Sequence, residues 1–361
     1  MKRILFILSS LNAGGAETFL MKVYRALPPD EYQFDFIVSV GNGCYTREVL
    51  ERGGRIYEIP ERRADLRGAM GGIRRVVREQ GYDAVLKLGE HSLAALDLMA
   101  AKRGGARRLA LRSCNAPTGL SLKARLAHGL FRPVANRVAN IKLAPSQLAA
   151  DYMFGRTKDV RLLHNGVDLS YFRYLSEGRA AIREEFGLDG KAVVGHVGRF
   201  HPQKNHRYLL EVFAEIRRVR QDAVLLLVGN GGLEEQVRDR VRELGLEDHV
   251  IFAGQRFDIP AMLSAMDVFL FPSLHEGMPN TVIEAQATGL PCVIADTITR
   301  EADLTGLVRY ISLDESPAFW TEQVLSALSE ERVDTAPMLR EQGYDIHDVA
   351  RELVALMTDN E

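Results

Sequence analysis

Two acidic residues eight positions apart frame the stretch of the chain that is best suited to chemistry. Glu276 and Glu284 enclose the residues GMPNT at 277–281, which follow a short apolar run at 268–271. These residues should open a helix, and the first turn of a helix binds anions because its free N–H groups and its dipole point the same way. The spacing fits a diphosphate at the helix end and a ribose beside the Glu284 carboxylate. The alternative is a capped helix with a solvated glutamate. Two glutamates at this spacing, taken alone, favour that alternative.

Two further loops have residues that suit phosphate groups. Gly198, Arg199 and Lys204 follow an apolar run at 193–197, at the carboxyl end of an expected parallel strand, where ligands bind in open α/β sheets. Arginine offers a planar fork and lysine a point charge, and both match phosphate oxygens. Gly15, after the first apolar run of the chain, removes a side chain where a ligand would approach the backbone. The alternative for Arg199 and Lys204 is that they are only solvated, and the alternative for Gly15 is a tight turn without a ligand.

Short apolar runs separated by amphipathic segments must position these loops. Their apolar residues are successive rather than alternating, which is typical of parallel strands buried on both faces. Alternation of such strands with helices predicts α/β domains with doubly wound sheets. The expected strands are 3–8, 34–40, 55–58, 84–88, 108–111, 142–144 and 160–162 in the first half, and 193–197, 224–228, 250–253, 268–271 and 291–295 in the second.

A polar, aromatic and glycine-broken stretch, residues 164–190, predicts the linker between two domains. The length of 361 residues also fits two domains. The expected N-terminal domain is 1–163 and the C-terminal domain 191–338, two Rossmann-like folds that face a cleft. Residues 339–361 predict a C-terminal helix that packs back on the N-terminal domain.

The cysteines and the apolar runs indicate in which compartment the protein works. The three cysteines, Cys44, Cys114 and Cys292, are far apart and not in metal-ligand spacing, so we expect a reducing compartment and no metal site. No run approaches the roughly 20 apolar residues of a membrane-spanning helix, and the apolar run at the N-terminus is too short for a signal peptide. These features predict a cytoplasmic protein.

The two halves differ in charge. Residues 1–163 have 12 more Lys and Arg than Asp and Glu, whereas the rest has 14 fewer, which predicts an anionic partner for the first half. The segment 121–142 is a basic amphipathic helix of the kind that lies on anionic membranes; a solvated helix packed by its apolar face is the alternative. Nucleic acid is not an expected partner, because aromatic stacking platforms and recognised modules are lacking.

In combination, the motifs resemble those of the retaining GT-B glycosyltransferases of family four, the "glycosyl transferases group 1" that build bacterial capsules, exopolysaccharides and O-antigens. The similar segments, in family order, are GGAE at 14–17, NGVD at 165–168, VGRFHPQKN at 197–205, LLLVGNGG at 225–232, FAGQRFDIP at 252–260 and EAQATGLPCV at 284–293. They extend over nearly the whole chain. The resemblance implies the GT-B fold and, as donor, a nucleotide diphosphate sugar, with a UDP-sugar favoured; no cofactor is implied.

The resemblance also implies roles for individual residues. Arg199 and Lys204 would hold the diphosphate, Glu284 the ribose, and Glu276 the transferred sugar. The residues that it places in the donor site are Gly15, Gly198, Arg199, Lys204, Gly229, Arg256, Phe257, Gly277, Met278, Pro279, Asn280, Thr281 and Glu284. Of these, Arg256 and Phe257 would lie beside the nucleobase and contact it through their backbone.

The acceptor side departs from the family pattern. Similar enzymes often have a histidine near the donor sugar, for which His91 is the candidate; a helix-capping or surface histidine is the alternative. Where relatives show HSHN, this chain has RSCN, so Arg112 and Asn115 are the expected acceptor residues. Arg112 would suit an anionic acceptor.

The expected activity is retaining, metal-independent transfer of a hexosyl or N-acetylhexosaminyl unit to a glycan acceptor linked to polyprenyl diphosphate. A front-face transfer without a covalent intermediate is favoured, although a nucleophilic role for Glu276 stays open. The enzyme would dock peripherally on the inner face of the plasma membrane. A sugar-nucleotide epimerase or hydrolase on the same fold is the alternative, against which the basic first half and the complete motif set speak.

Overall fold

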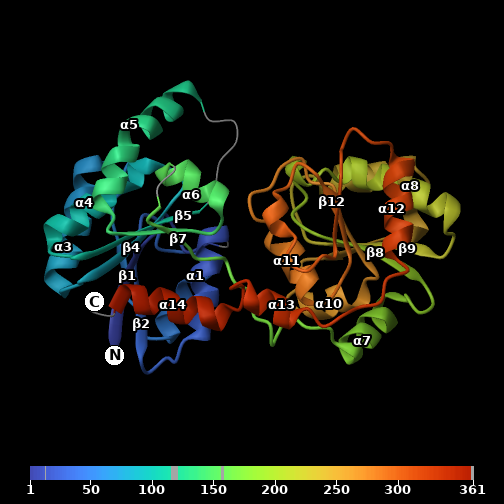
Figure 1. The fold of residues 1–361 in the computed structure, drawn as a ribbon, viewed down its shortest axis with the longest axis horizontal. Helices are drawn as coiled ribbons and strands as arrows, with labels where there is room; N and C mark the ends of the chain where they lie inside the picture. The colour runs from blue at the N-terminus through green and yellow to red at the C-terminus, as the bar shows by residue number, and fades with distance from the viewer. Residues whose placement is uncertain (13, 115–120, 156–157, 359–361) are drawn as a thin grey trace. The chain divides into compact units, whose positions relative to one another are not determined.

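The computed structural model describes residues 1–12, 14–114, 121–155 and 158–358, and their contacts divide the chain into two units (Figure 1). Unit 1 comprises Met1–Gly166 together with Gly343–Glu361, and unit 2 comprises Val167–Gln342. Each unit is built on a parallel sheet with helices between its strands. This architecture confirms the prediction of two doubly wound, Rossmann-like α/β domains.

Unit 1 has a seven-stranded sheet in the order β3-β2-β1-β4-β5-β6-β7. Its strands are β1 (Lys2–Ile7), β2 (Tyr32–Val38), β3 (Ile56–Glu58), β4 (Ala84–Gly89), β5 (Arg108–Ser113), β6 (Ile141–Ala144) and β7 (Val160–Leu162). The helices are α1 (Gly15–Ala26), α2 (Thr46–Glu51), α3 (Leu66–Gln80), the 3-10 turn η1 (Ser92–Ala94), α4 (Ala95–Gly104), α5 (Leu122–Val138), α6 (Gln147–Phe154) and α14 (Ile346–Thr358).

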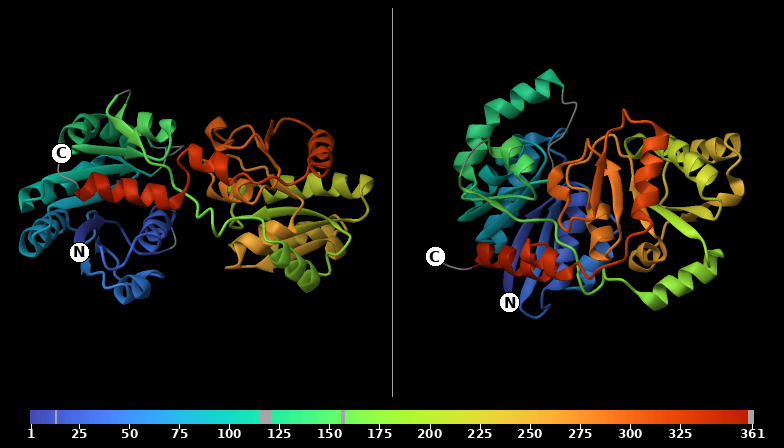
Figure 2. Two further views of the ribbon diagram at one scale, coloured as in Figure 1. Left: turned by 60° about the horizontal axis from the view of Figure 1, so that its bottom comes forward. Right: turned by 45° about the vertical axis from the view of Figure 1, so that its right-hand side comes forward.

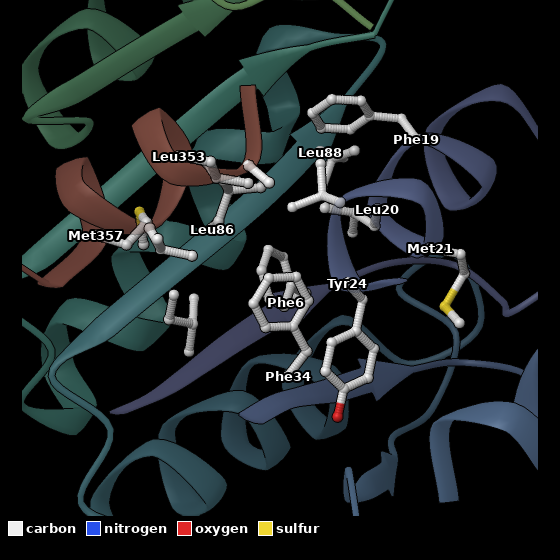
Figure 3. Close-up of a cluster of buried hydrophobic side chains, with 14 of the residues drawn as sticks. Phe6, Phe19, Leu20, Met21, Tyr24, Phe34, Leu86, Leu88, Leu353 and Met357 are labelled. Atoms are coloured by element: carbon white, nitrogen blue, oxygen red, sulfur yellow. The ribbon is translucent and has the colours of Figure 1, made fainter. Parts of the chain in front are cut away.

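The C-terminal helix α14 completes the core of unit 1. Its buried residues recur at helical spacing, which gives it one apolar face: Ile346, Val349, Ala350, Leu353, Val354 and Met357. This face packs in one cluster with Phe6 of β1 and Leu20 of α1 (Figure 3). The prediction that the C-terminal helix returns to the N-terminal domain is therefore confirmed, and Figure 2 shows α14 alongside the elements of unit 1.

Unit 2 has a six-stranded sheet in the order β10-β9-β8-β11-β12-β13. Its strands are β8 (Ala192–Val197), β9 (Ala223–Val228), β10 (Val250–Gly254), β11 (Val268–Phe271), β12 (Cys292–Ala295) and β13 (Val308–Ile311). Its helices are α7 (Ser176–Phe186), η2 (Pro202–Lys204), α8 (His206–Val219), α9 (Glu234–Glu243), η3 (Glu247–His249), α10 (Ile259–Ala265), α11 (Asn280–Ala287), η4 (Arg300–Ala302), α12 (Pro317–Ala327) and α13 (Ala336–Glu341). The edge strand β13 was not predicted from the sequence.

The stretch 164–190, which the sequence assigned to a linker, contains helix α7. This helix packs against α10 within unit 2, where Arg179 and Arg183 each donate to a carboxylate oxygen of Asp267 at 2.7 Å. The chain passes from unit 1 to unit 2 between Gly166 and Val167. Most of the stretch is thus part of the folded second unit.

Candidate donor site

Four neighbouring strands of unit 2 end at the loops that were expected to bind the donor. Strands β10, β9, β8 and β11 are adjacent and parallel. They lead respectively into the residues around Phe257, the turn at Gly229, the loop from Gly198 to Lys204, and the segment with Glu276. Because the carboxyl ends of parallel strands meet at one edge of a sheet, the fold gathers these segments at one place, where open α/β sheets bind ligands.

An ion pair joins two of these loops. Lys204 Nζ donates to Glu276 Oε1 at 2.6 Å, and the two side chains are only 17% and 12% exposed. The ammonium group also lies over the ring of Phe271, 4.5 Å from its centroid. Gln203 reinforces the junction, because its side chain donates to His275 O and its own carbonyl accepts from Leu274 N. The loops of β8 and β11 thus present one lysine and one carboxylate side by side.

The helix expected to bind phosphate begins beside this pair. Helix α11 starts at Asn280, with the buried Pro279 as its N-cap residue. The helix is held by Gln286, whose amide donates to Ala302 O at 2.7 Å and accepts from Leu304 N at 2.9 Å. Glu284, half-buried, lies about one turn into the helix. Gly277, Met278 and Thr281 are half-buried around this start.

Glycine backbone packs the remaining loops together. Gly229 N donates to Gly254 O at 2.8 Å, and Gly198 N donates to Val228 O at 2.9 Å. Gly229 has φ +141°, and a Cβ atom at this residue would lie 2.1 Å from Gly198 O. Only glycine is compatible with both the backbone angle and the close approach.

Replacing Gly229 by alanine is therefore expected to destabilise unit 2 by roughly 1–3 kcal/mol, because the backbone must shift to remove the overlap with Gly198 O. Thermal unfolding measures the change. Gly232→Ala is the matched control, since a Cβ atom there meets nothing within 4 Å. Equal melting temperatures for the two variants would contradict the packing described.

The loop after β10 is fixed by its own charges. Arg256 makes two bidentate interactions, to Asp258 at 2.9 and 2.7 Å and to Glu185 of α7 at 2.7 and 3.0 Å. The hydrogen bonds with the two carboxylates raise the pKa of Arg256. The Arg256 guanidinium is thus held by two carboxylates of the protein, whereas the side chain of the neighbouring Phe257 is 85% exposed. Arg199, on the β8 loop, is exposed as well.

Two buried histidines lie beneath the β8 loop and were missed by the sequence analysis. His196 Nδ1 donates to Leu270 O at 2.9 Å, and its ring meets that of His206 at a centroid distance of 5.0 Å. Within the described part of the chain, His196 Nε2 and both ring nitrogens of His206 are buried without a hydrogen-bond partner. Burial, with Lys204 nearby, lowers the pKa of His206 to about 4. Burial also lowers the pKa of His196 well below its ordinary value, so both rings are neutral at physiological pH.

This arrangement predicts a loss of stability in mild acid. The unfolded chain takes up a proton at His206 near its ordinary pKa of 6.5, but the folded chain does so only near 4. Stability therefore falls as the pH drops from about 6.5 to about 4, by roughly 1.4 kcal/mol per pH unit for this histidine. In His206→Phe, which keeps an aromatic ring against Phe200, the difference in melting temperature between pH 7.5 and pH 5 should shrink. An unchanged difference would contradict the prediction.

Among the expected site residues of unit 1, His91 and Arg112 have structural partners. Gly15 is the exposed first residue of α1. His91 caps η1: its Nδ1 accepts from Leu93 N at 3.3 Å, and its Nε2 donates to Ala124 O at 2.8 Å. These bonds favour the helix-capping alternative for His91. Asn115 lies outside the described residues.

Arg112 is enclosed within unit 1. It is 1% exposed, donates to Leu163 O at 2.9 Å and Asn165 Oδ1 at 2.8 Å, and lies over the ring of Phe19. Burial lowers its pKa to about 10. The sequence had assigned Arg112 to the acceptor side, whereas in the structure its guanidinium contacts Leu163, Asn165 and Phe19. Arg112 instead holds the end of unit 1 next to the crossing into unit 2.

Comparison with known proteins decides the family. A family model described as "Glycosyl transferases group 1" matches residues 191–330. "Putative glycosyltransferase EpsF" of Bacillus subtilis is 33% identical over 362 residues, which cover 95% of this chain and 93% of that protein. The chain belongs to the group 1 glycosyl transferases. A further relative, "UDP-Gal:alpha-D-GlcNAc-diphosphoundecaprenol alpha-1,3-galactosyltransferase" of Escherichia coli, is 36% identical over 38% of this chain and 36% of its own length.

Solved structures confirm the GT-B fold for this group 1 glycosyl transferase. Anabaena Alr3699/HepE in complex with UDP matches with a TM-score of 0.80 at 21% identity, over 98% of both chains. WaaG, a glycosyltransferase involved in lipopolysaccharide biosynthesis, matches with a TM-score of 0.70 at 14% identity, over 99% of this chain and all of that one. At these identities the likeness concerns the fold.

Proposed function

We propose that the chain is a retaining glycosyltransferase that moves a hexosyl or N-acetylhexosaminyl unit from a UDP-sugar to a glycan acceptor linked to polyprenyl diphosphate. The observation that carries the proposal is the Lys204–Glu276 pair, four residues before α11 begins, with Glu284 about one turn into that helix. The pathway would be the synthesis of a cell-surface polysaccharide. The Escherichia coli relative, by its name, uses a UDP-sugar and a diphosphoundecaprenol acceptor, and Alr3699/HepE binds UDP.

Departure of the nucleotide diphosphate is the step that these residues would accelerate. Negative charge grows on the diphosphate as the bond to the sugar breaks. Lys204, held by its ion pair with Glu276, would stabilise this charge together with Arg199 and the dipole of α11, which is electrostatic catalysis. This chemistry requires neither a metal ion nor a cofactor. Glu276, in the segment between β11 and α11, would contact the transferred sugar. Glu284 would accept hydrogen bonds from the ribose hydroxyl groups.

Incubation with donor distinguishes the transferase from the epimerase or hydrolase alternative. Proton NMR follows a UDP-sugar in the presence of the enzyme, first alone and then with a lipid-linked acceptor. The proposal predicts that the donor persists when alone and is consumed when acceptor is added, with the anomeric configuration kept in the product. Rapid formation of an epimer or of free sugar, at a rate that acceptor does not change, would instead establish the alternative.

A lipid-linked acceptor would require the enzyme to reach a membrane, and helix α5 offers a surface for this. Leu122, Leu126 and Leu130 recur every fourth residue, so they share one face, and they are 71%, 67% and 73% exposed. The first half of α5 projects beyond the rest of unit 1 (Figures 1 and 2). Around it, residues 98–150 have ten Lys and Arg and no Asp or Glu. Exposed leucines among basic residues fit insertion at an anionic lipid surface. No helix of the described residues is both long and apolar enough to cross a membrane.

Replacing Leu126 by glutamate is expected to weaken binding to vesicles with anionic lipid at least tenfold, because it removes an exposed leucine that would insert into the lipid and adds a charge that anionic lipid repels. Cosedimentation with vesicles measures the effect. Leu66→Glu on α3, where the leucine is 49% exposed, is the matched control and should bind as the wild type does. Binding of the wild type should also fall as salt rises. Equal binding of both variants would contradict docking through α5.

A further inference from the structure

An exposed tyrosine connects the turn after Asp168 with the loop at Phe257. Tyr171 Oη donates to Phe257 O at 3.1 Å. Burial raises the pKa of Tyr171, and the charges of Asp258, Asp168 and Glu284 raise it further. Tyr171 is 49% and Phe257 85% exposed. Two aromatic side chains are thus available to a ligand beyond Glu284.

Both ends of this connection are held in place. On one side, Asp168 Oδ1 accepts hydrogen bonds from the backbone N–H groups of Ser170 and Tyr171, which fixes the turn that bears the phenol. Phe172, 7% exposed, packs its ring edge-on to that of Tyr171. On the other side, the two bidentate interactions of Arg256 fix the peptide next to Phe257. The contact between Tyr171 and the Phe257 carbonyl is therefore a preorganised feature of unit 2.

We propose that Tyr171 is a specificity-determining residue that selects uridine over guanosine by occupying one acceptor position of the Phe257 carbonyl. This inference rests on the proposed function, because it assumes a nucleotide whose ribose lies at Glu284. A base that extends beyond that ribose meets the exposed rings of Tyr171 and Phe257. Aromatic rings stack on any base, so stacking alone does not select among nucleotides. Selection must come from hydrogen bonds at the edge of the base.

The Phe257 carbonyl is the group through which Tyr171 acts on that edge. A backbone carbonyl has two lone pairs, and the Tyr171 hydroxyl takes one of them. Uracil presents a single N–H between two carbonyl groups, which needs one acceptor. Guanine presents two adjacent donors, the ring N–H and the exocyclic amino group. Because the Tyr171 hydroxyl already uses one lone pair of the Phe257 carbonyl, only one of the two guanine donors can pair with that carbonyl. The second donor is left unpaired, which lowers the affinity for guanosine relative to uridine.

Calorimetric titration of wild type and Tyr171→Phe with UDP, GDP and ribose 5-phosphate tests the inference. Wild type should bind UDP more tightly than GDP. The variant should lose about tenfold of this preference, the size of one hydrogen bond, while its affinity for ribose 5-phosphate, which has no base, stays the same. Tyr174→Phe, 44% exposed in the same segment, is the matched control and should keep the full preference. Phe257→Ala should weaken both nucleotides alike.

The outcomes separate this inference from the proposal on which it rests. A ratio of UDP to GDP affinity that is the same in wild type and Tyr171→Phe would overturn the selection. So would an equal loss of affinity for all three ligands, since that indicates only a structural role for the hydroxyl. A wild type that prefers GDP overturns the inference but leaves a nucleotide-sugar transferase standing. Binding of neither nucleotide would overturn both.

Discussion

Lys204→Met is expected to lower kcat/KM by a factor of about 10² to 10³, the usual cost of losing one preorganised group that stabilises developing negative charge. Methionine keeps a long apolar side chain against Phe271 but removes the ammonium group that now lies 2.6 Å from Glu276. The diphosphate would then leave without its nearest fixed cation. Steady-state kinetics with a UDP-sugar and a lipid-linked acceptor measures the loss.

The control for this variant is Lys191→Met. Lys191 is an exposed lysine just before β8 of the same unit, so the substitution makes the same change of charge and size away from the site. Activity close to that of wild type is expected for it. Melting curves of both variants show whether the fold is kept. A folded Lys204→Met enzyme that turns over like Lys191→Met would remove Lys204 from the proposed mechanism.

Glu276→Gln is expected to have opposite effects on binding and on turnover. In the structure, Glu276 holds Lys204, and its negative charge repels an incoming diphosphate. Glutamine removes this repulsion, so UDP should bind several times more tightly, as a gain of about 1 kcal/mol implies. Turnover should fall about 100-fold, because the carboxylate that contacts the transferred sugar is lost. Calorimetry gives the affinity, and single-turnover kinetics gives the rate.

Glu215→Gln on α8 is the matched control for that pair of effects. Glu215 also pairs with a basic residue, Arg218, at 2.8 Å, but it lies on an outer helix rather than in the loops of the site. Both its affinity for UDP and its rate should match those of wild type. Weaker UDP binding in Glu276→Gln would show that the carboxylate helps to bind the diphosphate, which would contradict the expected repulsion between Glu276 and the diphosphate.

Local patterns explain why so much of the fold was predictable. Each run of successive apolar residues that predicted a strand is a strand in the structure, with its ends shifted by a few residues. Since parallel strands place their following loops at one edge of the sheet, the gathering of Gly198, Lys204 and Glu276 also followed from the sequence. Strand β13 was missed because its segment, VRYI, places polar groups among its apolar residues.

The partners of individual side chains were not predictable, because they depend on contacts between distant segments. Nothing in the spacing shows that Lys204 meets Glu276, 72 positions away. The sequence likewise placed Arg112 at the end of a strand. It did not show that Arg112 donates a hydrogen bond to Asn165. Tyr171 was overlooked for a different reason: the polar composition of 164–190 favoured a linker. Two signals in that stretch pointed the other way: its aromatic residues, which are uncommon in a solvated linker, and the NGVD segment at 165–168.

The central claim is that unit 2 holds the nucleotide diphosphate between Lys204 and the start of α11. A crystal structure of the protein with UDP tests this claim most directly. It should show a diphosphate oxygen within hydrogen-bond distance of Lys204 Nζ, the ribose hydroxyl groups at the Glu284 carboxylate, and the uracil beside Phe257. UDP bound elsewhere on the chain, with the Lys204–Glu276 pair untouched, would contradict it.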